Sequence, residues 1–130
     1  MSVLRSFVAI VLGYVTMVAC AWFAQEVMFP GVKWGSPAGP LFALGFCTAT
    51  LAGLGGVVTA VVAPRRPYLH LLPMAALITL ETSYLYARGV VRGPLWFEAT
   101  AGASLIAGTF IAAWLWMALK PRLFGSTATE

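Results

Sequence analysis

Residues 6–25 read SFVAIVLGYVTMVACAWFAQ and contain no charged side chain, with Arg5 directly before them and Glu26 directly after them. A helix needs about 20 mainly apolar residues to cross the hydrocarbon core of a bilayer. Because a helix satisfies its own backbone hydrogen bonds in lipid, this run predicts a membrane-spanning helix. The run is longer than the apolar part of a usual signal peptide, so we expect it to be retained rather than cleaved.

Three further runs have the same character. Residues 34–64 and 99–119 lack charged side chains, and residues 67–87 contain only Glu81. None alternates with period two, which excludes β-barrel strands. The sequence therefore predicts an all-α fold, an integral membrane four-helix bundle. Its single transmembrane domain would cover residues 1–130, with helices at about 4–28, 38–62, 69–88 and 95–119. Pro121 should end the last helix, leaving 121–130 as a cytoplasmic tail.

The overall composition supports a membrane protein and excludes several classes of function. The chain is 61% hydrophobic and 9% charged, whereas soluble domains carry about 25% charged residues. Its net charge of +4 is spread over chain ends and short loops, so we expect no nucleic-acid binding. Cys20 and Cys47 lie within apolar runs and form no disulfide framework. We expect neither a cofactor nor a metal, and no catalytic site, so the chain is not predicted to be an enzyme.

The basic residues predict the orientation of the bundle. Lys and Arg are more frequent in cytoplasmic loops than in external ones. In a four-span chain, one side would hold Arg5, Arg65, Arg66, Lys120 and Arg122, and the other side would hold only Lys33, Arg88 and Arg92. The sequence therefore predicts an N-in/C-in topology, with both termini in the cytoplasm.

Small residues recur at helical spacing in the second and fourth predicted helices. Such residues let membrane helices approach closely. They are Gly45, Ala49, Gly53 and Gly56 in the second helix, and Ala103, Ala107 and Gly108 in the fourth. We expect these two helices to pack together, either inside one bundle or against a second subunit.

A polar group is predicted in the outer half of the membrane domain. It comprises Glu81, Tyr84, Arg88, Glu98 and Glu26. Intramembrane carboxylates are costly and normally face a bundle interior or water. One interpretation is a pocket open to the outside that binds a proton, a cation or a small solute. The other is a structural network in which Arg88 or Arg92 neutralises Glu81 or Glu98.

A second group of polar residues lies at the opposite end of the predicted bundle. His70 is the only histidine and follows Arg65 and Arg66 at the start of the third helix. One chain offers no further ligands at that depth for a haem or a metal ion. We expect these three residues to contact lipid headgroups.

Several short motifs carry a resemblance to a known family. They are Leu4-Arg5-Ser6, Gly13-Tyr14, Ala52-Gly53, the turn from Pro64 to Pro67 followed by His70, and Pro94-Leu95-Trp96-Phe97. Together they resemble a family of small uncharacterised bacterial four-helix inner-membrane proteins. The resemblance implies a multi-pass protein of the bacterial inner (cytoplasmic) membrane, and it implies no activity or site residues. Small multidrug transporters are similar in length, but their key glutamate lies inside the first helix, where this chain has only Glu26 at the outer end.

Three functions remain open from the sequence. The first is a structural or accessory membrane protein that packs against itself or partner subunits, with membrane lipids around it and a homo-oligomer or a larger membrane complex as its assembly. The alternative is a small transporter or proton-coupled channel that uses Glu81. A lipid-modifying membrane enzyme comes third.

Overall fold

The computed structural model describes residues 2–63, 66–91 and 93–124. Arg65, Arg92 and residues 125–130 of the predicted tail lie outside them, as do the side chains of Ser2 and Phe124. The described residues form an all-α fold without strands, which confirms the predicted class. The elements are α1 (Ser2–Phe23), a π-helical turn η1 (Ala24–Met28), α2 (Ala38–Val62), α3 (Pro67–Ala87) and α4 (Leu95–Phe124).

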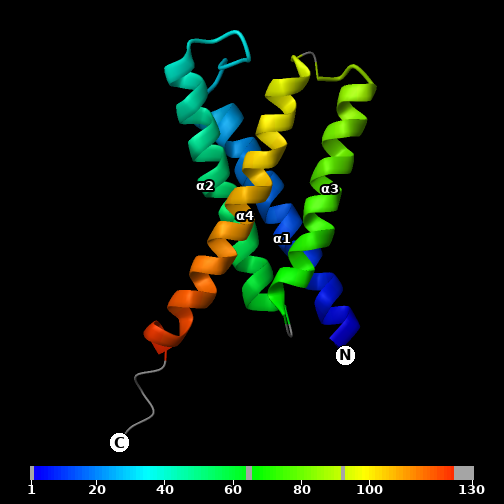
Figure 1. Cartoon of the computed structure of the whole chain (residues 1–130), viewed down its shortest axis with the longest axis vertical. Coiled ribbons are helices and arrows are strands. Elements are labelled where there is room, and N and C mark those ends of the chain that lie inside the picture. Colours follow the sequence, from blue (N-terminus) through cyan, green and yellow to red (C-terminus); the bar gives the residue numbers. More distant parts are fainter. Residues whose placement is uncertain (1, 64–65, 92, 125–130) are drawn as a thin grey trace, which may run out of the picture.

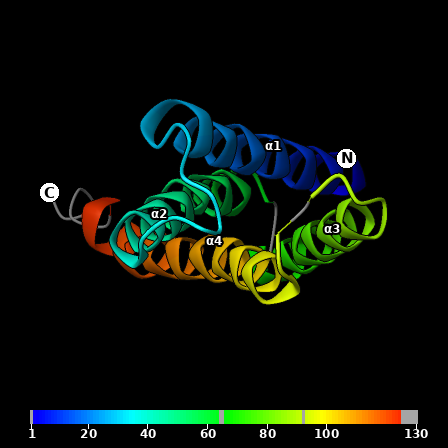
Figure 2. The same ribbon diagram turned by 90° about the horizontal axis from the view of Figure 1, so that it is seen from above.

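The helices run alternately up and down (Figure 1). The beginning of α1 and the end of α4 therefore lie at the same end of the bundle, which we call the terminal end. The segments 29–37 and 88–94 connect helices at the other end, which we call the loop end. Seen from above, α2 lies between α1 and α4, while α3 stands to one side (Figure 2). The most extensive helix contacts join α2 to α4 and α2 to α1, and α3 packs more loosely.

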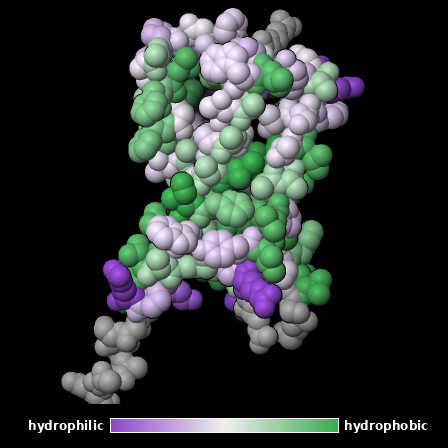
Figure 3. All heavy atoms as spheres, viewed as in Figure 1, coloured by the Kyte–Doolittle hydropathy of each residue, from purple (hydrophilic) through white to green (hydrophobic). Residues whose placement is uncertain are grey.

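Three of the helical segments are long and apolar enough to cross a membrane: Val3–Met28, Ala38–Val62 and Leu95–Leu123. The third helix, α3, is long enough at 21 residues but is not among them. Its hydropathy is lowered by His70, Thr79, Glu81, Thr82 and Ser83. On the face shown in Figure 3, the most hydrophilic residues lie toward the ends of the bundle and the band between them is mainly apolar.

The fourth helix ends later than the sequence predicts, and the last turn of the first helical segment is π-helical. The fourth helix continues through Pro121 to Phe124, so the expectation that Pro121 ends it is wrong. Proline removes one backbone donor, but its fixed φ is helical, and the residues after it continue the helix. At the end of the first helix, the backbone N–H of Phe29 donates to the carbonyl of Ala24 at 3.1 Å. This i→i+5 bond makes the last turn π-helical.

Glycines allow α2 to contact both of its neighbours through the backbone. A Cβ built on Gly55 would lie 2.5 Å from the carbonyl oxygen of Gly13 and 2.7 Å from the Cβ of Met17, both in α1. On the other side, a Cβ on Gly53 would lie 2.8 Å from the Cβ of Ala112 in α4. Real Cβ atoms do not approach this closely, so these contacts require glycine. In this bundle α2 and α4 thus pack inside one chain.

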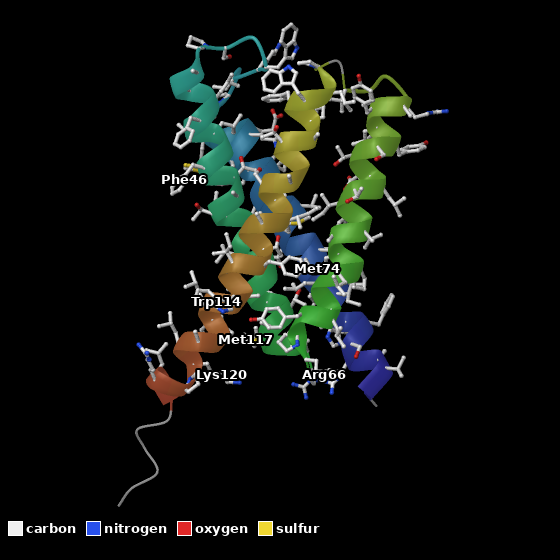
Figure 4. The ribbon with its side chains drawn as sticks, viewed as in Figure 1. Phe46, Arg66, Met74, Trp114, Met117 and Lys120 are labelled. Atoms are coloured by element: carbon white, nitrogen blue, oxygen red, sulfur yellow. The ribbon has the colours of Figure 1, made fainter. Side chains whose placement is uncertain are left out.

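The core next to these contacts is filled by apolar side chains and by two threonines that bond to backbone. Met17, Ala52 and Ile78 form one buried cluster, and Leu71, Met74 and Ala113 form another. The hydroxyl of Thr59 is fully buried and donates to the carbonyl of Gly55 at 2.9 Å. Thr109 is equally buried and bonds to Leu105 in the same way. Met74 lies between α3 and the helices behind it (Figure 4).

Candidate functional site

A cavity of about 440 Å³ opens at the loop end of the bundle, and we call it the end pocket. Its walls come from η1, from the first half of α2 and from the first half of α4, with the 29–37 segment above them. Six polar residues line it: Gln25, Glu26, Lys33, Thr48, Glu98 and Ser104. Apolar residues, among them Leu44 and Phe97, complete the walls. Two of the predicted carboxylates therefore share one cavity.

Glu98 is placed by the start of α4. It lies in the first turn of that helix, where a negative charge interacts favourably with the helix dipole. Its side chain is partly buried, and a Cβ built on Gly93 would lie 2.8 Å from its Oε1 atom. The same Cβ would lie 3.5 Å from the indole of Trp34, so the two loops meet beside Glu98. Glu98 also lines a second cavity of about 390 Å³ between α3 and α4.

Glu26 reaches the end pocket from the π-helical turn. The turn includes Ala24, which is fully buried, and Gln25 and Glu26, which are exposed. A π-helical turn holds one more residue than an α-helical turn, and such turns occur frequently at functional sites. Here the π-helical turn carries both polar residues that α1 and η1 contribute to the end pocket.

Thr48 is the buried polar residue of the end pocket. Its side chain is 6% exposed, and its hydroxyl has no hydrogen-bond partner in the described part of the chain. Threonines in helices commonly donate to the carbonyl four residues earlier. Thr16, Thr50, Thr59, Thr79, Thr100 and Thr109 all do so. Thr48 does not, although buried polar groups are normally satisfied.

The other predicted polar residues lie outside the end pocket. Glu81 is exposed on α3 and accepts a hydrogen bond from the hydroxyl of Tyr14 in α1. The guanidinium of Arg88 lies 5.8 Å from the ring centroid of Tyr84, a cation–π contact on the same helix. Within residues 2–63, 66–91 and 93–124, the chain forms no ion pair that joins an arginine to Glu81 or Glu98. The structure thus places Glu26 and Glu98 together, and Glu81, Tyr84 and Arg88 elsewhere.

Two of the three predicted headgroup residues, Arg66 and His70, lie at the terminal end, and Arg65 lies outside the described residues. Arg66 and Lys120 are both near this end in Figure 4. Arg66 precedes α3 in the left-handed conformation, with φ of 47°. The Nε2 atom of His70 lies 2.9 Å from the hydroxyl of Ser6, which joins α3 to α1. His70 is separated from Glu81 by about 16 Å along α3, at 1.5 Å per residue, so the two do not meet in one site.

Some of the predicted packing residues make close contacts between helices, and others do not. A Cβ on Gly108 would collide with the carbonyl of Ala49, and one on Gly56 with the carbonyl of Thr109. By contrast, a Cβ on Gly45 would meet no atom within 4 Å, and this glycine lines the end pocket. Ala103 and Ala107 are exposed on α4. The close contacts on α2 therefore extend from Ala49 to Gly56, and Gly45 lies outside them.

Sequence reasoning missed several residues of these sites. The sequence did not mark Thr48 as a site residue, because threonine is common inside apolar helices. Tyr14 and Ser6 are the partners of Glu81 and His70, but they come from another helix. Gly13 and Gly55 belong to small-residue patterns in the sequence, but only the crossing of α1 over α2 shows that the two meet.

Comparison with protein-family models, curated proteins and solved structures finds no match to this chain. The geometry of the described residues therefore carries the functional argument.

Proposed function

We propose that this chain is a four-span membrane protein of the bacterial inner membrane, with both termini in the cytoplasm. In this proposal it acts as a structural or accessory subunit, through packing of its helices against a partner subunit or a second copy of itself. Three apolar helices support the membrane setting. The exposed polar surface of α3 supports the role as a subunit.

The single observation that carries the proposal is the exposure of Glu81 in the middle of the bundle. Although its carboxylate accepts a hydrogen bond from Tyr14, the residue remains exposed on α3. Thr79 and Ser83, two residues to either side, are exposed as well. A carboxylate that faces lipid is costly, and such residues are almost always covered by protein or water. A further membrane helix lying against α3 would cover it.

A groove beside Glu81 fits this role. It has a volume of about 400 Å³ and is lined by Tyr14, Val15, Val18, Ala19, Trp22 and Glu81. It runs between α1 and α3, where the helix contacts are loose. Val15, Val18 and Ala19 line it together with Trp22, which is 61% exposed. We infer that this α1–α3 groove receives the partner helix, with a hydrogen-bond donor on that helix facing Glu81.

Photo-crosslinking in the native membrane tests this proposal. A benzoylphenylalanine residue at position 18 should give one discrete crosslinked product, because Val18 lines the groove. The same residue at position 54 is the control, because Leu54 is exposed on α2 outside the groove. A product of twice 13.8 kDa would indicate a second copy, and another discrete mass would indicate a partner subunit.

The chemistry of the contact is tested by Glu81→Leu in the chain that carries the label at position 18. This change should lower the yield of the discrete product several-fold, because the polar contact is lost while an apolar surface suited to lipid remains. Equal products from positions 18 and 54, or a yield that Glu81→Leu leaves unchanged, would rule the proposal out.

A small transporter is the second candidate function, and the end pocket favours it. The cavity opens at the loop end. Farther from that end, the helices are in close contact at Gly13, Gly53, Gly55 and Gly56. Glu98 and Glu26, rather than Glu81, line this cavity. Solute flux in proteoliposomes that is abolished by Glu98→Gln and kept by Glu81→Gln would favour this candidate.

A further inference from the structure

We propose that the end pocket is a binding site for a small organic ammonium ion that carries N–H donors, held by the carboxylates of Glu26 and Glu98. This site is independent of the α1–α3 groove and of any partner helix there. Three features of the end pocket point to this ligand: its charge, its size and the unsatisfied hydroxyl of Thr48.

The charge of the lining favours a cation. Among the described residues that line the end pocket, two are carboxylates and one, Lys33, is an ammonium group, so their formal charge is −1. No salt bridge joins these three residues in the described part of the chain. Both carboxylates therefore remain available to a ligand. Lys33 offers a place for a neighbouring anionic group on the same ligand.

The size of the pocket favours an organic ion over a metal ion. Its volume of about 440 Å³ falls in the range of about 300–1,000 Å³ that is typical of small-molecule sites. The described residues contain no group of three or more His, Cys, Asp or Glu side chains that could hold a metal. Two carboxylates spread around a larger cavity suit a ligand that fills the space between them.

The hydroxyl of Thr48 is the observation that points to a missing partner. It is buried in the wall of the pocket without a hydrogen bond, and such a group is costly to leave unsatisfied. The hydroxyl of Thr50, two residues later and on another face of the same helix, donates to the carbonyl of Phe46 at 2.8 Å. A bound ligand with an N–H group would satisfy Thr48 as an acceptor.

The kind of ammonium follows from the acceptors. Carboxylates, the Thr48 hydroxyl and the Gln25 amide oxygen all accept hydrogen bonds, which a quaternary ammonium cannot donate. A primary or secondary amine donates them, and the ring of Phe97 in the wall adds cation–π attraction. A free amine and the ethanolamine headgroup of a lipid share this chemistry. The experiment separates these two sources.

Binding of radiolabelled ethanolamine to the full chain tests the proposal. The protein is placed in nanodiscs of phosphatidylcholine and phosphatidylglycerol, whose headgroups contain no ammonium N–H, and binding is measured by equilibrium dialysis. We expect one saturable site per chain. Ethylene glycol, which is similar in size and uncharged, should not compete. If phosphatidylethanolamine in the discs suppresses binding, the lipid headgroup is the source. If it does not, the source is a free amine.

Three substitutions connect this binding to the end pocket. Glu98→Gln and Glu26→Gln should each weaken it about tenfold or more, because a charge-assisted hydrogen bond is lost. Thr48→Val should weaken it about fivefold, and the matched Thr50→Val should leave it unchanged. Gly45→Leu should abolish it, because a side chain there extends into open space at the pocket wall.

The Gly45→Leu variant keeps the proposal falsifiable if the glutamine variants do not fold, because it changes no charged group. Two results would overturn the proposal. The first is the absence of saturable binding in discs that lack phosphatidylethanolamine. The second is saturable binding that persists unchanged in Gly45→Leu or in both glutamine variants.

Discussion

The hydrogen bond from Tyr14 to Glu81 joins two helices that otherwise pack loosely. Tyr14 also contacts both buried clusters of the core. The ring therefore belongs to the packed interior, while its hydroxyl reaches the exposed carboxylate. This side chain adds a polar contact to the apolar ones by which Leu71, Met74 and Ile78 join α3 to the core.

We expect a double-mutant cycle of Tyr14→Phe and Glu81→Leu to show a coupling of about 1 kcal/mol in the free energy of unfolding. The reason is that each single change removes the same interhelical hydrogen bond. The measurement is unfolding of the full chain in mixed micelles with increasing denaturing detergent. Additive effects of the two substitutions would contradict a direct bond.

The need for a partner of Glu81 could be predicted from the sequence, but the partner could not. A carboxylate inside an apolar run requires a hydrogen bond or a counter-charge. On its own helix, Tyr84 and Arg88 share a face with it, which made them the natural choices. In the structure these two residues contact each other, and the bond to Glu81 comes from α1 because helix crossing is a property of the whole bundle.

Among the helices, α2 and α4 show how far a small-residue pattern predicts packing. The α4 rows Ala99–Ala103–Ala107 and Ser104–Gly108–Ala112 have the same spacing. Gly108 and Ala112 lie against α2, whereas Ala99, Ala103 and Ala107 are exposed. The small-residue pattern predicts that α4 packs closely against another helix. It does not predict which of the two rows makes the contact, because both rows would allow a neighbouring helix to approach equally closely.

Two glycine substitutions in α2 should have opposite effects on stability. In Gly56→Ala the new methyl group would collide with the carbonyl of Thr109, so we expect a loss of about 1–3 kcal/mol. In Gly45→Ala it meets open space, so we expect no loss and a gain of up to about 1 kcal/mol from helix propensity. Unfolding in mixed micelles measures both. Equal losses would show that the α2–α4 contact is not as close as described.

For the whole molecule, the number of membrane crossings depends on α3. Length and the absence of long charged segments predicted four spans, and the structure has four antiparallel helices of which three are apolar enough to span alone. The remaining helix, α3, differs because it carries more polar residues. Packing against the other helices partly compensates the cost of these residues, as the contact between His70 and Ser6 shows. Hydropathy alone does not include that compensation.

Cysteine labelling on the two sides of α3 tests the four-span arrangement. In chains without Cys20 and Cys47, Arg66→Cys and Arg88→Cys place one thiol at each end of α3. A membrane-impermeant maleimide added to spheroplasts should label position 88 and should reach position 66 only after the membrane is opened. Labelling of both positions from one side would show that α3 does not cross, and the reversed pattern would contradict the proposed orientation.

The glycines on both sides of α2 have a consequence for motion. Because Gly55 fits against α1 while Gly53 and Gly56 fit against α4, turning α2 about its axis would drive its backbone into a neighbour on one side or the other. The trio α1, α2 and α4 is thereby locked as one rigid body. A tilt of α3, which packs more loosely than these three helices, would open or narrow the cavity between α3 and α4 that Glu98 also lines.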